Sequence, residues 1–350
     1  MNGNRVLRSR KVRRATERPS IRAILTYAML VFWSLVCIFP LYWLAVTSLK
    51  GEAAIMQGPF YLPFIDFMPT LDAWRAILTD DNDHLVRRFL NSSIVATTAT
   101  GLIILVGGSA VYGLTRFRSR LGVNRLLCFG VAAMSLTAAF YAPAAAWQLV
   151  LALAGAMFVM LASRLPDGGR VIGNGQVFAA ILASRLLPPV VIVLPIYMMA
   201  QKFGALDTHF ALIAAYCAAN LPVAVWLMMP VFGTKATEQE EAAKLDGASH
   251  FRILFTILLP MMAGSIAAIS LVIFVLCWNE YLLAATLTND TVSTLPVWVA
   301  GQMSIKEAQV GGEGDEWPQL SAAILFMALP LLVFTGFVQR VLGRMAVTRL

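Results

Sequence analysis

Long uncharged stretches dominate this chain and constrain its fold more than any other feature. Residues 23–49 and 89–115 contain no Asp, Glu, Lys or Arg, and neither do the 38 residues from 126 to 163. About 20 apolar residues suffice for a helix to cross a bilayer. The chain is 59% hydrophobic and 13% charged, against roughly 45–50% and about 25% in soluble domains, which excludes a water-soluble enzyme and a disordered protein. The sequence therefore predicts an all-α, polytopic transmembrane helical bundle.

The alternation of apolar and polar segments predicts about eight spans. A single helix over 126–163 would be about 57 Å long at 1.5 Å per residue, nearly twice the thickness of the hydrocarbon core. This run is therefore expected to form a two-helix hairpin that turns near Pro143. The predicted spans are 24–48, 89–115, two helices within 126–163, 176–201, 210–232, 257–284 and 319–339.

The positions of the basic residues predict the orientation in the membrane. With both termini in the cytoplasm, 20 of the 27 Lys and Arg residues lie in inner segments and six in outer ones, as the positive-inside rule requires. Arg185 lies within a span, where a structural pair or snorkelling is expected rather than contact with substrate. The net charge of +8 is thus attributed to topology and not to a nucleic-acid partner. Residues 1–22 and 341–350 are expected to be cytoplasmic tails.

Residue types that commonly carry catalysis or metal binding are sparse. Each of the four cysteines lies in an apolar run, no CxxC pair occurs, and the chain has three histidines, which argues against disulfide frameworks and zinc sites. The sequence contains no Gly-Lys dipeptide, HExxH or GxSxG, and therefore no Walker A loop. We expect no enzymatic activity, no cofactor and no metal, so another chain must hydrolyse any ATP that drives transport.

One inner polar segment has a sequence typical of two short helices. Thr237 to Leu245 favours a helix that starts with a capping box, in which Thr237 is the N-cap and Glu240 lies three residues on. Gly247 can end that helix in a left-handed conformation, and a second short helix can run from Ser249 toward Pro260. Such a pair would form a compact knob beneath the membrane. The alternative is a solvated loop between two spans.

The spacing within this segment resembles the EAA loop of ABC importer permeases. A glycine follows the glutamate of Glu241-Ala242-Ala243 by six positions, an isoleucine follows it by sixteen, and a Leu-Pro pair comes next. In that family the loop inserts into a cleft of the cytosolic ATPase, so the resemblance implies a coupling loop at about 237–260. The implied ATPase-coupling residues are Glu241, Ala242, Ala243, Asp246, Gly247, Ile257 and Pro260.

Other segments resemble the carbohydrate-uptake, maltose-permease G subunit-like branch of the binding-protein-dependent transport inner-membrane component family. These segments are residues 39–50, 91–92, 187–189, 194–197, 278–281 and 294–297. The resemblance implies a type I ABC importer permease fold, in which a six-span core carries the hairpin 126–163 as an insertion. The permease domain would cover 23–340 and move a mono- or oligosaccharide across the bacterial cytoplasmic membrane.

The same resemblance implies the partners of the chain. They would be cytosolic ABC ATPase subunits, a second homologous permease subunit, an extracytoplasmic solute-binding protein, the sugar and the membrane lipid. An importer permease for a non-sugar solute is the main alternative. A stand-alone secondary transporter and a membrane-embedded enzyme are further alternatives, although the sequence shows no clear internal repeat and no clustered catalytic set.

Two groups of residues are candidates for a substrate path. Trp278, Asn279 and Glu280 could line it, because aromatic faces pack on sugar rings and amides bind hydroxyl groups. Alternatively, Glu280 caps its span at the outer interface. Pro188 and Pro189 free backbone carbonyls within a span, which is tolerated where they are buried or line a cavity. The sequence is compatible with either a pore-lining kink or a purely structural kink at these prolines.

Overall fold

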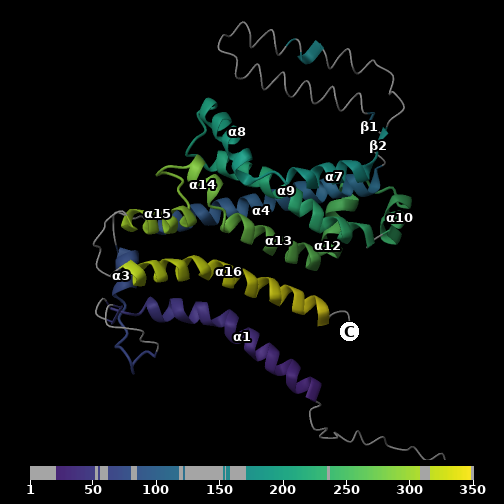
Figure 1. The fold of residues 1–350 in the computed structure, drawn as a ribbon. Helices are drawn as coiled ribbons and strands as arrows, with labels where there is room; N and C mark the ends of the chain where they lie inside the picture. The colour runs from purple at the N-terminus through teal and green to yellow at the C-terminus, as the bar shows by residue number, and fades with distance from the viewer. Residues whose placement is uncertain are drawn as a thin grey trace, which may run out of the picture. The chain divides into compact units, whose positions relative to one another are not determined.

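The computed structural model is almost entirely helical (Figure 1). Four helices are long and apolar enough to cross a membrane: α1 (Ile21–Thr47), α4 (Leu85–Arg116), α9 (His209–Thr234) and α16 (Glu316–Val347). Two bent helix pairs raise this number to six if each pair forms one span. The all-α prediction is thus confirmed where the structure describes the chain. The described residues are 21–51, 54–55, 62–79, 85–117, 121–122, 153, 155–157, 171–234, 237–307 and 316–347.

The predicted hairpin at 126–163 lies outside the described residues, apart from the helical positions 153 and 155–157, so its two spans stay a prediction. The segments that flank it are described. β1 (Leu121–Gly122) pairs antiparallel with β2 (Val171–Ile172). The chain therefore leaves the helical bundle and returns to it at one place, as an inserted excursion requires (Figure 1).

The chain divides into two compact units, 1–80 with 309–326 and 81–308 with 327–350. The first unit holds α1, α3 (Asp72–Thr79) and the start of α16. Most side chains of α1 are exposed, and the chain becomes buried only where the helix ends. Lys50, just after this helix end, is buried. Its ammonium lies 5.3 Å from the ring centre of Trp43 and 5.8 Å from that of Phe67.

Three helices form the core of the second unit. α4 packs along α9, and α13 (Ala263–Trp278) packs against both. Their facing side chains, Val95 and Met228 among them, are completely buried. The two helices α4 and α9 are in ordinary van der Waals contact at Gly107, where a Cβ would lie 3.5 Å from the Cβ of Ala224. Small residues commonly permit such contacts between membrane helices.

The span predicted at 176–201 is broken in the structure, at the prolines where a kink is expected. It consists of α7 (Asn174–Ser184) and α8 (Pro189–Lys202), which meet at 87°. Pro188 and Pro189 explain the break, because proline lacks an N–H group and disfavours helical geometry in the residue before it. Arg185 lies at this break and donates through Nη1 to the carbonyl of Ala219 on α9, at 3.0 Å. Its role in the fold is thus structural.

The span predicted at 257–284 is also interrupted. After α10 (Thr237–Leu245), the chain forms α11 (His250–Arg252), the π-helix η1 (Ile253–Leu258) and α12 (Leu259–Met261). Residues 250–261 meet α13 at 84°. The bend lies at Met262, whose φ of −98° and ψ of 11° depart from helical values. α13 ends at residue 278, and α14 (Leu282–Leu287) and α15 (Leu295–Glu307) follow.

Asn91, near the start of α4, holds the loop between α14 and α15. Its amide nitrogen donates to the carbonyls of Thr291 and Ser293 at 3.1 and 3.2 Å. Its amide oxygen lies 3.1 Å from Nε2 of His209, which is therefore the donor. The amide thus satisfies backbone groups that lie outside any helix.

Asp207 holds the same loop from the turn between α8 and α9. It adopts a left-handed backbone conformation with φ of 56°. Its carboxylate accepts the backbone N–H groups of Asn289, Thr291 and Val292 at 3.0–3.2 Å. Partial burial raises the pKa of Asp207, but hydrogen bonds from the Thr291 side chain and from these amides outweigh it and lower the pKa to about 2.

We predict that Asp207→Gly loosens this loop. Glycine tolerates the positive φ but removes the acceptor, so hydrogen exchange of the amides at 288–294 should accelerate by about tenfold, since hydrogen bonds to a charged group contribute about 1.5–3 kcal/mol and this group is partly exposed. Asp207→Asn retains one acceptor oxygen and should have a smaller effect.

The same loop should respond to acid in the wild-type protein. Because the pKa of Asp207 is lowered from 3.8 to about 2, its stabilising contribution is complete above about pH 4 and is lost as the pH falls through about 2. Exchange rates that are unchanged in Asp207→Gly would show that the carboxylate does not hold the loop.

Candidate functional site

A helix–glycine–helix unit, residues 237–261, follows α9 and is called the knob below. α10 has the bounds that the sequence predicts. Gly247 follows it with φ of 75°, and its N–H donates to the carbonyl of Lys244 at 3.0 Å. The N–H of Ala248 donates to the carbonyl of Ala243, also at 3.0 Å. These two bonds form a Schellman motif, so the predicted left-handed glycine is confirmed.

The second half of the knob begins at a capping serine. Oγ of Ser249 accepts the N–H of Arg252 at 3.4 Å. Three side chains of the π-helix η1, Ile253, Leu254 and Leu258, are buried and anchor this half. The helix was predicted, but its π geometry was not. Such turns are rare and occur frequently at functional sites.

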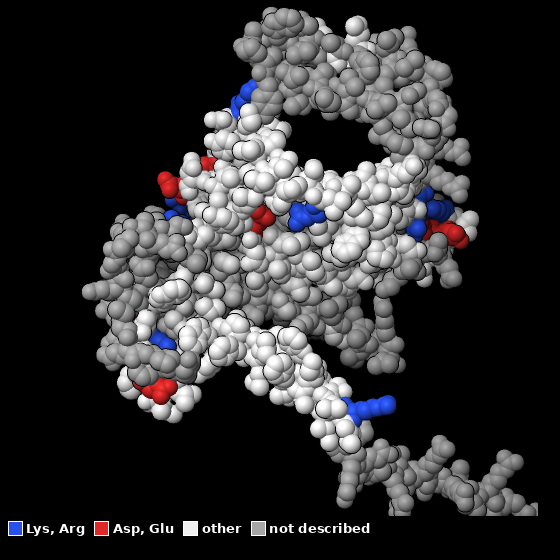
Figure 2. Space-filling model, in the orientation of Figure 1, with Lys and Arg blue, Asp and Glu red and all other residues white. Residues whose placement is uncertain are grey.

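The tip of the knob exposes both acidic and apolar side chains. Glu241 and Asp246 are exposed. Leu245 and Phe251, on either side of Gly247, are 90% and 74% exposed. In Figure 2 charged side chains form small groups separated by uncharged surface, and one mixed group of acids and bases lies at α10. Large apolar side chains exposed beside charges are typical of a surface that binds another protein.

The other predicted coupling residues have different environments. Ala242 and Pro260 are exposed, Ile257 is half-buried and Ala243 is buried. A Cβ atom at position 247 would have no heavy atom of a neighbouring element of this chain within 4 Å. Ala243 and Ile257 thus pack within the knob, whereas the exposed residues are accessible to a partner.

The predicted capping box at the start of α10 is wrong. The carboxylate of Glu240 does not turn back to the helix start but is buried against Arg116 of α4 and Lys244. Sequence reasoning missed Arg116. The available signal was an arginine at the end of one span and a run of acids in another inner segment.

Trp278 is a core residue in this structure. Its side chain is buried, and its indole N–H donates to the carbonyl of Met327 at 3.0 Å. Phe274 stacks on its ring at 5.7 Å and Phe89 meets it edge-on at 5.9 Å. Because its faces are already occupied, Trp278 does not offer a platform for a sugar ring in this conformation.

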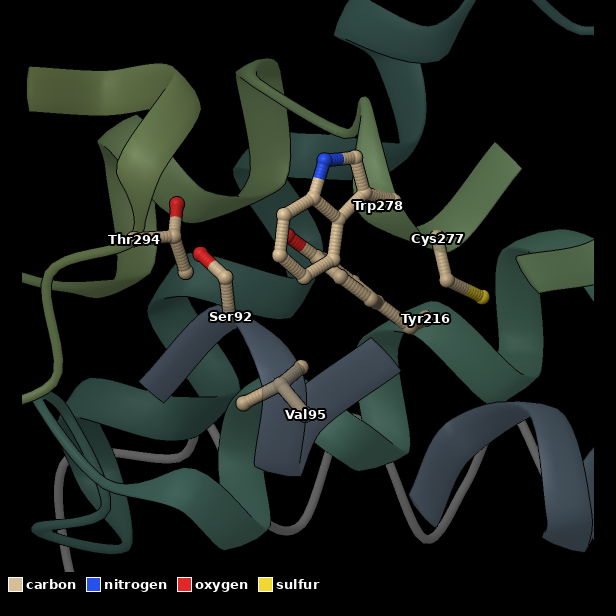
Figure 3. A pocket seen from close by; sticks show the side chains of 6 residues that line it. All are labelled: Ser92, Val95, Tyr216, Cys277, Trp278 and Thr294. Atoms are coloured by element: carbon tan, nitrogen blue, oxygen red, sulfur yellow. The ribbon is translucent and has the colours of Figure 1, made fainter. Parts of the chain in front are cut away.

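Six side chains, that of Trp278 included, surround a small space beside its ring (Figure 3). The residues around the space beside its ring are Ser92, Val95, Tyr216, Cys277, Trp278 and Thr294. That space has no room for a water molecule. Oγ of Ser92 also accepts the N–H of Leu295 at 2.8 Å. These residues therefore fix α4, α9 and α13 to one another rather than forming a solute pocket.

Asn279 and Glu280 lie at the turn after α13. Asn279 is exposed and donates through Nδ2 to the carbonyl of Val275 at 2.9 Å. Glu280 is half-buried, and its Oε1 accepts the N–H of Leu283 at 3.1 Å. The capping interaction considered for Glu280 is thus present, but it caps the start of α14 and not the end of α13.

Pro188 and Pro189 are exposed at the break between α7 and α8. α8 packs against α14, the helix that Glu280 caps. Pro188 and Pro189 thus lie at the start of α8, and Asn279 and Glu280 lie just before α14, which packs against α8. Over the residues that the structure describes, no three His, Cys, Asp or Glu side chains come together as a metal site.

Curated relatives resemble this chain over nearly its whole length. The diacetylchitobiose uptake system permease protein NgcG of Streptomyces coelicolor is 27% identical, with 95% of this chain and 91% of that protein covered. The trehalose/maltose transport system permease protein MalG of Thermococcus litoralis is 22% identical, with 91% and 93% covered.

A solved structure shows the same fold. A chain of a bacterial ABC transporter involved in the import of the acidic polysaccharide alginate superposes with a TM-score of 0.59 at 18% identity, covering 91% of this chain and 96% of that chain. Residues 170–346, which hold the knob and the helices around it, match the family described as binding-protein-dependent transport system inner membrane component. The chain therefore belongs to this family, and it is a multi-pass inner membrane permease of an ABC importer that works with a binding protein and is not itself an enzyme.

Proposed function

We propose that this permease carries a mono- or oligosaccharide across the cytoplasmic membrane. The curated relatives support a sugar, since their names specify uptake of diacetylchitobiose and transport of trehalose and maltose, and a third is named as a sulfoquinovosyl glycerol permease. All three align with more than four fifths of their own length. A non-sugar solute is the alternative. Family membership removes the stand-alone secondary transporter, because members depend on a binding protein.

The exposed tip of the knob carries the proposal for coupling. Leu245 and Phe251 offer apolar contact beside Gly247, and Glu241 and Asp246 add charge. In a membrane protein such a mixed surface suits a soluble protein partner rather than lipid. We assign this partner as a cytosolic ABC ATPase subunit, with residues 237–260 as its coupling loop.

The complex would contain two ATPase subunits, a second homologous permease and an extracytoplasmic solute-binding protein, all embedded in or attached to membrane lipid. ATP binding would close the ATPases, move both coupling loops and switch the permease pair from inward-open to outward-open. The tails 1–22 and 341–350 would lie in the cytoplasm, and the permease domain, 23–340, would include the hairpin 126–163. The prevalence of Lys and Arg in the inner segments supports this orientation.

Asn279 and Glu280 are the residues that we assign to the substrate path, with Pro188 and Pro189 shaping the neighbouring break. The Asn279 amide oxygen can accept from a sugar hydroxyl while its nitrogen serves Val275. Glu280 uses Oε1 for its cap and can present the other oxygen to the solute. Trp278 would position this turn through its packing rather than contact the sugar.

Gly247→Val and Glu241→Lys should abolish ATP-driven uptake without preventing membrane insertion. Valine at a left-handed position costs roughly 1–2 kcal/mol, and lysine reverses a charge at the proposed interface. Both effects should weaken retention of the ATPase, which co-purification of the detergent-solubilised complex measures.

Two matched variants separate the causes. Gly247→Asn tolerates the left-handed backbone, so a loss in this variant reports close approach of the partner rather than backbone strain. Gln239→Lys adds a lysine to α10 about 200° around the helix from position 241 and should retain uptake. If Gly247→Val and Glu241→Lys keep their ATPase and transport at the wild-type rate, the proposed coupling role is wrong.

The sugar proposal is tested by growth and uptake. A strain that lacks this chain should lose growth on one mono- or oligosaccharide as sole carbon source and keep growth on amino acids. Loss of uptake of a peptide or another non-sugar solute instead would assign the alternative.

On the sugar so identified, Asn279→Ala and Glu280→Ala should impair uptake while the ATPase remains bound. Glu280→Gln preserves the cap but replaces a charged acceptor by a neutral one, so half-maximal uptake should require about fivefold more solute. Wild-type kinetics in Glu280→Gln together with a loss in Glu280→Ala would limit Glu280 to capping. Tyr281→Phe, at the exposed neighbouring position, is the control.

A further inference from the structure

We propose that Arg116 and Glu240 form an intramolecular strut through which movement of the knob displaces α4 and α9 together. Arg116 and Glu240 are positioning residues in this proposal and do not contact solute or ATP. The inference rests on the proposed coupling role of the knob, and it adds the route by which the knob acts on the helical core.

The carboxylate of Glu240 is the centre of the strut. The side chain is 2% exposed. Nε of Arg116 donates to its Oε2 at 2.5 Å, and Nζ of Lys244 lies 2.9 Å from its Oε1. Oε2 is thus hydrogen-bonded to Arg116, whereas Oε1 has the Lys244 ammonium beside it but accepts no hydrogen bond of good geometry. Lys244 belongs to α10 itself. Of these two ion pairs, the one with Arg116 is therefore the one that joins Glu240 to a different helix.

Arg116 links three helices. It is the last residue of α4, where a cation interacts favourably with the helix dipole. Besides its bond to Glu240, its Nη2 donates to the carbonyl of Phe232 near the end of α9, at 3.3 Å. The planar guanidinium has five N–H donors in a fixed fork. It can therefore hold the ends of α4, α9 and α10 in one arrangement.

A second contact joins α4 to the other half of the knob. The hydroxyl of Tyr112 lies 3.0 Å from Nδ1 of His250 at the start of α11. The ring of Phe117, directly after α4, meets the same histidine at 4.9 Å. The last turn of α4 thus holds α10 through Arg116 and α11 through Tyr112, on both sides of Gly247.

Apolar packing alone cannot fix α10. On this helix, Glu240 and Ala243 are the buried members among the side chains that the structure describes. The other route from the knob to the core runs through η1 and α12 and then turns by 84° into α13. This route changes direction at the bend. The ion pair instead joins α10 directly to the ends of α4 and α9, so we assign it the larger share of the transmission.

The strut is tested in the complete importer by counting solute molecules imported per ATP hydrolysed. Arg116→Met and Glu240→Met should each lower this ratio by about tenfold or more, because each breaks the buried ion pair that joins α10 to α4. The ATPase should remain bound, since the tip of the knob is unchanged. The double reversal Arg116→Glu with Glu240→Arg should recover part of the ratio.

Lys244→Met is the matched control. It removes a cation from the same carboxylate but leaves the bond to α4, and its side chain is 43% exposed, so the ratio should change less than about twofold. If Arg116→Met does not accumulate in the membrane, Arg116→Lys replaces it. Lysine keeps the charge but cannot bridge Glu240 and Phe232 together, so a reduced ratio is again expected.

Each outcome bears on the strut separately from the coupling role. A wild-type ratio in Arg116→Met and Glu240→Met, or in the substitute Arg116→Lys, overturns the strut. Dissociation of the ATPase from these variants also overturns it, because the pair would then only shape the docking surface. If Gly247→Val and Glu241→Lys leave transport intact, the coupling role itself fails. A loss in those two variants with normal coupling in the Arg116 and Glu240 variants removes the strut alone.

Discussion

Backbone hydrogen bonding in a medium without water is the constraint on which this structure depends. Lipid offers no partner for a free N–H or carbonyl group, so spanning segments must be helices and each interruption must be satisfied by protein. Several polar side chains of the second unit satisfy backbone groups where helices begin, end or break. Asn91 and Asp207 serve the loop between α14 and α15, and Glu280 serves the start of α14. Rare polar residues in an apolar chain are thus explained first by the backbone.

The lengths of the uncharged runs predict the helices well but not their bends. α1, α4, α9 and α16 follow their runs closely because a run of 20 or more apolar residues has one stable structure in a bilayer. The prolines at 188 and 189 indicate a break, yet the angle of 87° depends on packing against α9 and α14. The π geometry of η1 had no signature in its apolar sequence, since it arises from one extra residue in the turn.

Two residues show how tertiary contacts override local patterns. The position of Glu240 three residues after Thr237 fits a capping box, but an arginine 124 positions earlier offers the carboxylate a stronger partner. Trp278 precedes two polar residues, and the sequence predicts that it lines the substrate path with them. Its large apolar surface is instead satisfied by Phe89, Phe274 and the space between α4 and α13. Gly247, by contrast, was predictable because a Schellman turn depends on local sequence alone.

α4 connects the two polar assemblies of the second unit. Asn91 near its start holds the loop between α14 and α15, and Arg116 at its end holds the knob. The 25 residue steps from Asn91 to Arg116 span about 38 Å of continuous helix, and α4 packs along α9. In the proposed mechanism, a displacement of the knob would therefore reach the loop at 288–294 with little loss along the helix. Because Glu280 lies on the turn that leads into α14, and α14 leads into that loop, the same displacement would alter the proposed substrate path. One rigid helix with a polar attachment at each end would then suffice to relate ATP binding on one side of the membrane to solute release on the other.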